Sequence, residues 1–534
     1  MATPSADRGD DRRPFPVFPI VVLAAVAAPF LVTLAATIGE RWYPGSDIAL
    51  EVLRIADVGG RDTPLTGVIS RFGWDHPGPL LFYVLAPFHW VAGVRGVLLG
   101  VLLVNLAAVV VVCWAARRRG GDPALLVFAV AILILVRAGG ADRLVDPWNP
   151  WIAVLPFFAY LTLVWCVAER DLVALPGAVI AGSFVVQAHV GYAPLVAVLG
   201  AGAVGLAFVR RAGEADFGAV RRPLGIAAGL GLLAWLPPLV EQVAGDRGNL
   251  GDIVAWFRSP GESRLGIVDA FGVMGRELPA TWIHGNEVRA EGFLRGIVLP
   301  ASTVPALAFM AVVLVAAGVA WVRGAPDATR LTALVALGTA VGVAATARIT
   351  GLVAPYLFRW WWVLGAAWWC ALAWSVWSAA GRPFPDRARL VTALGVGVLA
   401  ATVAIGAVPA RTPQPEITEA VSALLGPTVA GLDVDRPFTV TCAGSGDLDA
   451  TCLALFLALR DRGLEAYFPP ARAREVGARR TLDPERGAYV VTVVTGEDRT
   501  EREAAPTGAT RLASYELGSG LGFVVRWEPV SRER

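Results

Sequence analysis

The sequence predicts a polytopic α-helical membrane protein that carries a small α/β domain at its C-terminal end. Of its 534 residues, 56% are hydrophobic and 17% are charged, whereas a soluble protein usually carries about a quarter charged residues. Apolar runs recur up to residue 410, and the sequence is more polar beyond that point. We therefore expect a transmembrane domain over residues 1–410 and a separate domain over residues 411–534.

The membrane part contains about eleven predicted spans. A helix needs roughly 20 apolar residues to cross the hydrocarbon core of a bilayer. The first run resembles a signal peptide, but it is longer than the apolar core of one and follows a stretch of mixed charge. We therefore count it as a span. The predicted spans are 15–38, 97–116, 123–137, 150–167, 171–188, 191–209, 223–240, 300–322, 331–350, 354–379 and 390–410.

The placement of arginine predicts the orientation in the plasma membrane. Arginines gather in alternate short loops, and such loops usually stay in the cytoplasm. The N-terminus is then cytoplasmic and the C-terminal domain is extracytoplasmic. This assignment requires residues 77–93, with Pro79, Pro87 and His89, to lie along the outer membrane surface without crossing it. The arginines concerned are Arg12, Arg13, Arg117–Arg119, Arg170, Arg210, Arg211, Arg221, Arg222, Arg323, Arg330, Arg382, Arg387 and Arg389.

Three external segments follow from this topology. Residues 41–94 form a loop with juxtamembrane helices, one of which is "DIALEVLRIADVG" with Ile48, Val52, Ile55 and Ala56 on one face. Residues 241–299 form a second long loop. The tail alternates predicted strands such as "GAYVVTVVT" with a helix in "ATCLALFLALRDRG". Cys442 and Cys452 are close together in this tail, so we expect a short-loop disulfide if the domain is extracytoplasmic.

Ionisable residues gather on the predicted outer side, where each is a functional candidate because charges at membrane depth are costly unless paired or hydrated. A lipid-linked phosphate would need arginine or protonated histidine, and an acceptor hydroxyl would need a carboxylate as general base. Together these residue types predict a site at the outer membrane face. The candidates are Asp47, Arg71, Asp75, His76, Asp142, Asp146, His189, Glu241, Arg348 and Arg359.

Structural roles compete with the functional ones at several of these positions. Asp47 stands at a predicted helix start, where an N-cap is an equally good interpretation. Asp75 and His76 would also serve to solvate a turn, and His189 would be a hydrogen-bonded histidine at a helix end. Arg359 precedes three tryptophans and would then be an interfacial anchor with cation–π contacts.

The order of these motifs resembles the GT-C membrane glycosyltransferases, and within them the polyprenyl-phosphate-sugar-dependent branch related to protein mannosyltransferases and aminoarabinose transferases. The first span precedes a loop with the early acidic residue Asp47, followed by "DHPGPLLFYVLAPFHWVAG" and a span that ends in the basic turn "CWAARRRGG". A late span carries an arginine beside aromatic residues in "YLFRWWW". Asp47 stands alone without an adjacent Glu, and Gly78 splits the His-Pro-Pro element, which leaves metal dependence open.

The resemblance implies an inverting glycosyltransferase that moves a sugar from a polyprenyl-phosphate donor to an extracytoplasmic glycan, protein or lipid acceptor of the cell envelope. Asp47 would be the base. Asp142 or Asp146 would position the acceptor or a divalent cation such as Mg²⁺, Mn²⁺ or Ca²⁺. Arg359 would bind the donor phosphate, with Arg71, Arg348 or His76, and the remaining candidates are Asp75, His189 and Glu241. The lysine-free, arginine-rich composition is associated with an actinobacterium.

Two other classes of function are open. The first is a transporter or flippase for a lipid or amphiphile, and the second is a non-catalytic envelope-assembly or sensing protein. Transporters often show internal repeats with polar groups near the bilayer midplane. We detect no repeat between the two halves, and the polar groups gather at the outer rim, which favours an enzyme. Membrane lipids are expected partners and nucleic acid is not.

Overall fold

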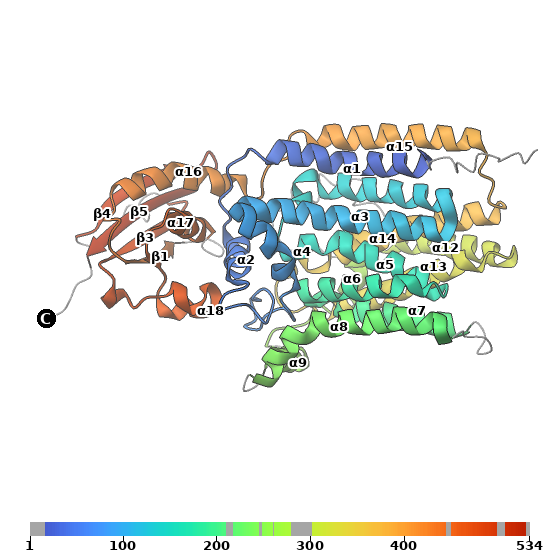
Figure 1. Cartoon of the computed structure of the whole chain (residues 1–534), viewed down its shortest axis with the longest axis horizontal. Helices are drawn as coiled ribbons and strands as arrows, with labels where there is room; N and C mark the ends of the chain where they lie inside the picture. Colours follow the sequence, from blue (N-terminus) through green and yellow to red (C-terminus); the bar gives the residue numbers. More distant parts are fainter. Residues whose placement is uncertain are drawn as a thin grey trace, which may run out of the picture.

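The computed structural model describes residues 17–209, 217–244, 248–259, 261–278, 302–444, 450–498 and 508–529. A bundle of long helices occupies most of the molecule, and a small sheet domain lies at one end of the bundle (Figure 1). This arrangement confirms the predicted fold class, a multi-pass helical membrane protein with a small C-terminal α/β domain.

Helices coincide with all eleven predicted spans. Among the described residues, eight helices are long and apolar enough to cross a membrane, judged by length and composition. The count differs because α3 contains two predicted spans, α6 is short and α14 is rich in tryptophan. The helices are α1 (Val17–Thr37), α3 (Leu80–Gly139), α5 (Val154–Ala168), α6 (Leu175–Ala188), α7 (Ala193–Val209), α8 (Phe217–Ala244), α12 (Val304–Val322), α13 (Pro326–Ala347), α14 (Trp360–Ala379) and α15 (Asp386–Ala407).

The long helix α3 is broken twice. Ala92 with Gly93, and Gly120 with Gly121, have non-helical backbone angles. At the first break the chain folds back so closely that a Cβ on Gly96 would lie 1.8 Å from the carbonyl oxygen of Phe88. Residues 80–91 are therefore a separate helical segment that does not continue into the next span. Their position along the outer membrane surface stays a prediction.

The arginine-rich loops converge at the end of the bundle opposite the sheet domain. Glu169 accepts two hydrogen bonds from Arg330, at 2.8 and 2.7 Å, and lies 3.8 Å from Arg119. Arg382 contacts Asp327 at 2.5 Å. These pairs connect loops that the sequence places on one side, so the arginines of these loops gather at one end; Arg12, Arg13, Arg210 and Arg211 lie outside the described residues.

The helix α2 (Ser46–Asp57) belongs to two hydrophobic cores at once. Ile48, Val52 and Ile55 are buried in the core of the bundle, and Ala49, Leu50 and Leu53 are buried in the core of the sheet domain. The sequence predicted a single apolar face that included Ala56, but Ala56 is exposed. A helix with one face in each core connects the two parts rigidly.

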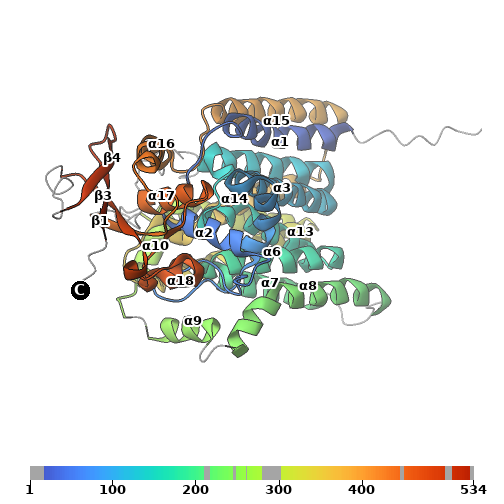
Figure 2. The same ribbon diagram turned by 60° about the vertical axis from the view of Figure 1, so that its left-hand side comes forward.

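The C-terminal domain is a five-stranded mixed sheet in the order β2-β1-β3-β5-β4. Its central strand β3 is parallel to β1 and antiparallel to β5. The helices α16 and α17 pack beside the sheet (Figure 2). The predicted disulfide between Cys442 and Cys452 is confirmed. The elements are α16 (Pro415–Ala430), β1 (Phe438–Gly444), α17 (Ala450–Asp461), β2 (Ala466–Tyr467), α18 (Ala473–Val476), β3 (Tyr489–Gly496), β4 (Thr510–Glu516) and β5 (Gly522–Pro529).

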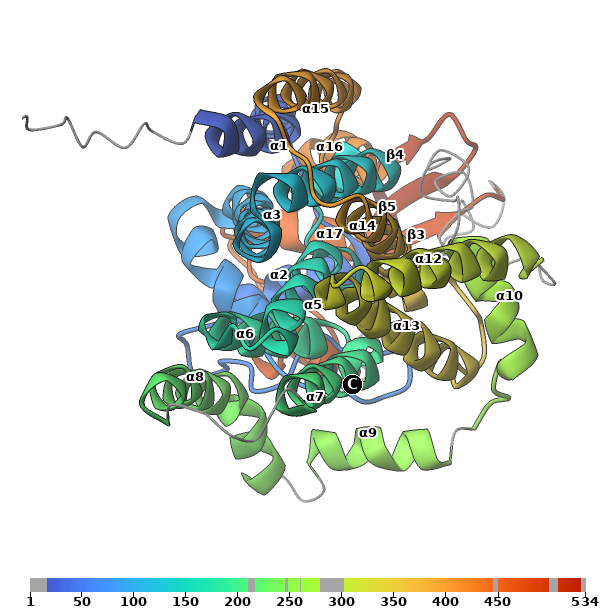
Figure 3. The same cartoon turned by 90° about the vertical axis from the view of Figure 1, so that its right-hand side faces the viewer.

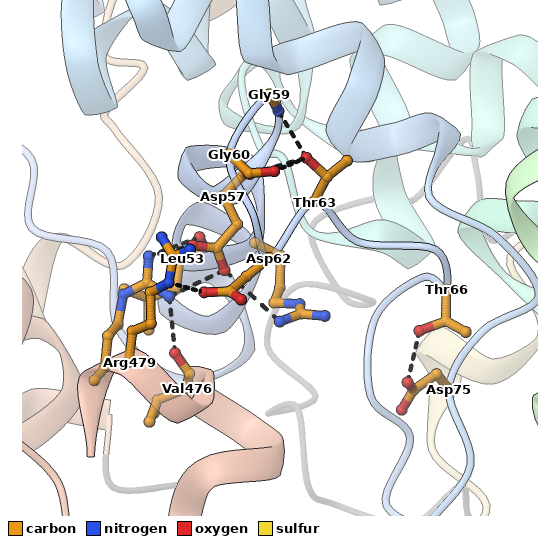
Figure 4. Close-up of polar contacts among 12 residues, drawn as sticks. Leu53, Asp57, Gly59, Gly60, Asp62, Thr63, Thr66, Asp75, Val476 and Arg479 are labelled. Atoms are coloured by element: carbon orange, nitrogen blue, oxygen red, sulfur yellow. Dashed lines mark hydrogen bonds and ion pairs between the residues drawn. The ribbon is translucent and has the colours of Figure 1, made fainter. Parts of the chain in front are cut away.

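Three ion pairs attach this domain to residues 41–94, and the contacts of Asp57 and Asp62 are drawn in Figure 4. Arg480 forms two contacts with the carboxylate of Asp57, at 3.0 and 2.8 Å. Arg479 lies 2.6 Å from Asp62, and Arg474 lies 3.5 Å from Asp75. The Asp57 pair is the most buried of the three, with side chains 13% and 10% exposed.

The segment predicted as the second external loop contains α9 (Asn249–Arg258) and α10 (Ile267–Glu277). Figure 3, viewed along the bundle, shows α9 between α8 and α10. Residues 245–247, 260 and 279–299 of the predicted external loop lie outside the described part of the chain. The backbone of Leu265 and Gly266 is hydrogen-bonded to the end of α13, so this segment is held against the bundle close to Arg348.

Candidate functional site

Two cavities meet at Asp47, at the end of the bundle that faces the sheet domain. The larger cavity has a volume of about 870 Å³, and the smaller one has a volume of about 470 Å³. Asp47, Trp148 and Tyr356 line both of them. The carboxylate of Asp47 is thus accessible from either side.

Asp47 lies in the first turn of α2, and the N-cap position is taken by Gly45. The N-cap interpretation of Asp47 is therefore wrong. Its Oδ2 accepts a hydrogen bond from the indole Nε1 of Trp148 at 3.2 Å. Burial raises the pKa of Asp47, and the Trp148 hydrogen bond lowers it in part. Because a general base works best when its pKa approaches the working pH, this environment suits a base.

Glu51 is a buried acidic residue that the sequence pattern did not distinguish from its neighbours. It lies one helical turn after Asp47, and its Oε1 accepts the backbone N–H of Asn149 at 3.1 Å. Burial raises the pKa of Glu51 well above its usual value, and the charges of Asp47 and Asp146 raise it further. The i, i+4 spacing on one amphipathic helix was the available signal, because it places both carboxyls on one side.

The smaller cavity contains a second acidic residue and two arginines. Asp146 is buried, pairs with Arg143, and accepts the backbone N–H of Trp148 at 3.1 Å. Burial raises the pKa of Asp146, and Arg143 opposes that effect. The guanidinium of Arg359 lies 4.6 Å from the ring centre of Trp151 and 4.5 Å from that of Trp362. The cation–π contacts predicted for Arg359 are present, and the same residue also lines the cavity.

The larger cavity is lined by three arginines, Arg71, Arg348 and Arg472, and has an aromatic wall. Arg71 donates to the carbonyl oxygen of Leu352 at 2.9 Å, and Arg348 donates to that of Phe257 at 2.9 Å. These bonds use only some of the five N–H groups of each guanidinium. The wall is a cluster in which the rings of Phe72 and Trp256 lie 4.2 Å apart, with Trp74 and Phe257 beside them.

His76 and His189 form a pair on the wall of the larger cavity, with ring centres 5.0 Å apart. The Nδ1 of His76 accepts the backbone N–H of Val190 at 3.1 Å, and the Nδ1 of His189 accepts that of Gly191 at 3.3 Å. An Nδ1 that accepts a hydrogen bond carries no proton, so each neutral ring carries its proton on Nε2. Burial lowers the pKa of His189 to about 4 and that of His76 well below its usual value. The pair is therefore neutral and can donate through Nε2.

The C-terminal domain supplies part of both cavities. Leu453, Arg472 and Glu475 line the larger cavity, and Ala450 lines the smaller one. Arg472 and Glu475 are paired with each other, at 2.6 and 2.8 Å. The sequence predicted a separate domain in this region and gave no signal that its side chains would reach the site.

Three predicted site residues line neither cavity. Asp75 accepts a hydrogen bond from the Thr66 hydroxyl at 2.7 Å, and its backbone is bound by Asn249. Asp142 accepts the backbone N–H of Arg411 at 3.3 Å. Glu241 accepts the backbone N–H of Asn249 at the start of α9. Each of these carboxylates fixes a loop or a helix start near the site.

The carboxylates of the site do not form a metal-binding group. In the described residues no three His, Cys, Asp or Glu side chains converge as ligands of one ion. Asp146 is held by Arg143, and Asp47 is held by Trp148. The divalent cation that the sequence left open stays a prediction, and the proposed reaction does not depend on one.

No protein-family model and no curated protein matches the sequence. Among solved structures, ArnT from Cupriavidus metallidurans bound to undecaprenyl phosphate is similar, with 15% identity, a TM-score of 0.49, and coverage of 96% of this chain and 98% of that one. The archaeal oligosaccharyltransferase AglB from Archaeoglobus fulgidus, in complex with an inhibitory peptide and a dolichol-phosphate, has 13% identity and a TM-score of 0.47, with 89% of this chain and 69% of that one covered. Both are members of the GT-C group that the sequence resembles. At such identities and TM-scores, any functional conclusion depends on the residues of the two cavities.

Proposed function

We propose that this protein is an integral-membrane glycosyltransferase that transfers a sugar from a polyprenyl-phosphate donor to an acceptor outside the cytoplasm. The observation that carries the proposal is the position of Asp47, a partly buried carboxylate at the junction of two cavities that both contain arginine. A transferase needs such a junction, because donor and acceptor must reach one base from different sides.

The larger cavity suits the donor. Its aromatic wall would contact isoprenoid units or the transferred sugar, and Arg71 and Arg348 would bind the phosphate. His76 and His189 would add neutral N–H donors. This assignment separates Arg359 from the predicted phosphate-binding set, because Arg359 lines the smaller cavity.

The smaller cavity would then hold the acceptor. Asp146, Arg143 and Arg359 line it together with Trp148 and Trp151, and both guanidiniums lie 4.6 Å from the ring centre of Trp151. In one displacement, Asp47 takes the proton of the acceptor hydroxyl while the acceptor oxygen attacks the anomeric carbon. The bond from that carbon to the phosphate oxygen breaks, and the polyprenyl phosphate leaves with the electron pair. A single displacement inverts the anomeric configuration.

The proposed topology places the sheet domain and both cavities outside the cytoplasm. The disulfide between Cys442 and Cys452 supports this placement, because disulfides persist in oxidising compartments. The convergence of the arginine-rich loops at the opposite end supports a cytoplasmic location for those loops.

The test compares purified wild-type protein with Asp47→Asn and Asp47→Glu in lipid nanodiscs. A panel of radiolabelled polyprenyl-phosphate sugars is supplied with envelope-derived acceptors, and binding of labelled undecaprenyl phosphate is measured separately. We expect Asp47→Asn to abolish transfer while binding stays within about threefold of wild type. Asp386→Asn is the matched control, because the Asp386 side chain is 96% exposed and lines neither cavity.

The outcomes separate the proposed enzyme from its rivals. Full transfer by Asp47→Asn would remove Asp47 from the role of base. Movement of the intact lipid across the membrane without sugar transfer would support a flippase, and neither activity would support an assembly or sensing protein.

A further inference from the structure

A third cavity of about 620 Å³ lies at the arginine-rich end of the bundle, remote from Asp47. Its walls come from the second break of α3 and from the linker between α14 and α15. Its charged lining consists of four arginines and one acidic residue, and its aromatic lining consists of three rings. The four arginines are Arg117, Arg118, Arg382 and Arg389, the acidic residue is Asp122, and Trp114 is one of the three rings.

Glycine is required where α3 turns at this cavity. A Cβ on Gly120 would lie 2.0 Å from the ring of Trp374 in α14, and Gly121 has a φ of 65°. The turn therefore packs directly on α14. This packing holds Arg117 and Arg118 beside the start of α15.

The four arginines keep hydrogen-bond donors that their carboxylate partners do not use. Arg117 donates through Nε to Asp122 at 3.2 Å, and Arg389 donates through one terminal nitrogen to Asp386 at 3.2 Å. Arg118 and Arg382 pair with acidic residues that do not line the cavity. A guanidinium has five N–H groups, and a carboxylate engages two of them at most in a fork. The side chains are 39–47% exposed, so the remaining donors are accessible to an anion.

Exposed apolar side chains follow the lining residue Arg389 along α15 and are called the apolar border here; those of α15 do not themselves line the cavity. Trp114 is 42% exposed, and Leu390, Val391 and Leu394 on the first turns of α15 are 62–66% exposed. These residues continue directly from Arg389 along the helix. A ligand that matches this surface has an anionic head group, which the arginines would bind, and hydrocarbon chains, which the apolar side chains would contact. Lipid head groups bind in basic pockets of this kind at the cytoplasmic ends of spans.

We propose that this cavity binds the phosphodiester head group of an anionic glycerophospholipid, with its acyl chains along the exposed apolar surface of α15. A free phosphate would satisfy the arginines equally well, but it would leave that apolar border uncovered. The site is separate from the proposed glycosyl transfer, and it does not depend on that function.

The experiment titrates delipidated protein in detergent with phosphatidylglycerol or phosphatidylcholine and counts bound lipid by native mass spectrometry. We expect phosphatidylglycerol to bind at least tenfold more tightly than phosphatidylcholine. The double variant Arg117→Gln/Arg389→Gln should lose that preference. Arg387→Gln is the matched control, because Arg387 lies two residues from Arg389, is exposed and does not line the cavity.

Every outcome bears on the proposal. Equal affinity for the two lipids, or an unchanged preference in the double variant, would overturn it. Displacement of phosphatidylglycerol by equimolar inorganic phosphate would assign the cavity to a free anion and overturn the lipid assignment. If the glutamine variant fails to fold, Arg117→Lys/Arg389→Lys keeps both charges with fewer donors, and a partial loss of the preference is then the expected result. Because the probe is phosphatidylglycerol and the readout is binding, failure here is distinct from failure of the Asp47 test.

Discussion

Replacing Asp57 by Asn should loosen the attachment between the C-terminal domain and the helix that carries Asp47. Arg480 contacts both carboxylate oxygens of Asp57, and it also donates to the carbonyl oxygens of Val476 and Leu53 (Figure 4). The amide of Asn removes the negative charge and turns one acceptor into a donor. The guanidinium would then stay buried with its two carbonyl partners and one amide oxygen, without a neutralising charge.

The size of the effect follows from burial. Breaking a fully buried ion pair costs about 3–5 kcal/mol, and the remaining carbonyl partners of Arg480 reduce this cost to about 2–3 kcal/mol, in the range of hydrogen bonds to charged groups. This corresponds to a change of roughly 30- to 150-fold in the docking equilibrium. Asp62 pairs with Arg479 through side chains that are 37% and 54% exposed, so Asp62→Asn should cost less than about 1 kcal/mol.

Hydrogen–deuterium exchange on the full-length protein measures this difference. Peptides covering residues 46–57 and 473–480 should exchange faster in Asp57→Asn and at nearly the wild-type rate in Asp62→Asn. Transfer activity should fall in the first variant only, because α2 holds Asp47 between the two cores. The reasoning is refuted if Asp62→Asn exchanges as fast as Asp57→Asn, or if neither differs from wild type.

Three further predictions concern the site and the sheet domain. Trp148→Phe removes the hydrogen bond that lowers the pKa of Asp47, so this pKa should rise. The acidic limb of the pH–activity profile should then move to higher pH. An unmoved limb would contradict Asp47 as the base. His189→Gln keeps a donor at the Nε2 position and should retain undecaprenyl phosphate binding. His189→Phe removes the donor and should weaken this binding about 10- to 100-fold. Equal dissociation constants for the two variants would exclude this donor role. The double variant Cys442→Ser/Cys452→Ser should destabilise the sheet domain by about 2–3 kcal/mol, because the disulfide closes a short loop in the unfolded chain. If the variant has the thermal midpoint of the wild type, and reductant does not change the midpoint of the wild type, the disulfide contributes nothing to stability.

Asp47 shows the limit of what a local sequence pattern can predict about a site residue. A polar residue at a helix start beside glycine is compatible with an N-cap, and the sequence could not decide between a cap and a catalytic role. The structure places the cap at Gly45 and orients Asp47 towards Trp148, 101 residues later in the chain. Only folding brings the indole to the carboxylate, so no local signal could have identified this contact.

In the predicted phosphate-binding set, the sequence grouped residues that the structure separates. Arg71, Arg348 and Arg359 share a residue type and a predicted side of the membrane, and sequence reasoning grouped them for that reason. The structure places Arg359 in one cavity and the other two in the second. Membership of a cavity depends on which backbone segments approach each other, and composition does not encode that distance.

The sequence alone predicted the membrane-embedded helices, their order, that residues 77–93 are not a full span, and the C-terminal α/β domain, and it offered the disulfide on the condition that this domain is extracytoplasmic. These features follow from local physics, because the hydrophobicity of about 20 consecutive residues, the backbone limits of proline and glycine, and the spacing of two cysteines act over short distances. The tertiary structure decided that α2 is shared by two cores, that Arg472 and Glu475 of the last domain reach the larger cavity, and that Glu51 is buried beside Asp47. Those features depend on contacts between residues up to about 430 positions apart, and such contacts exist only once the whole chain has packed.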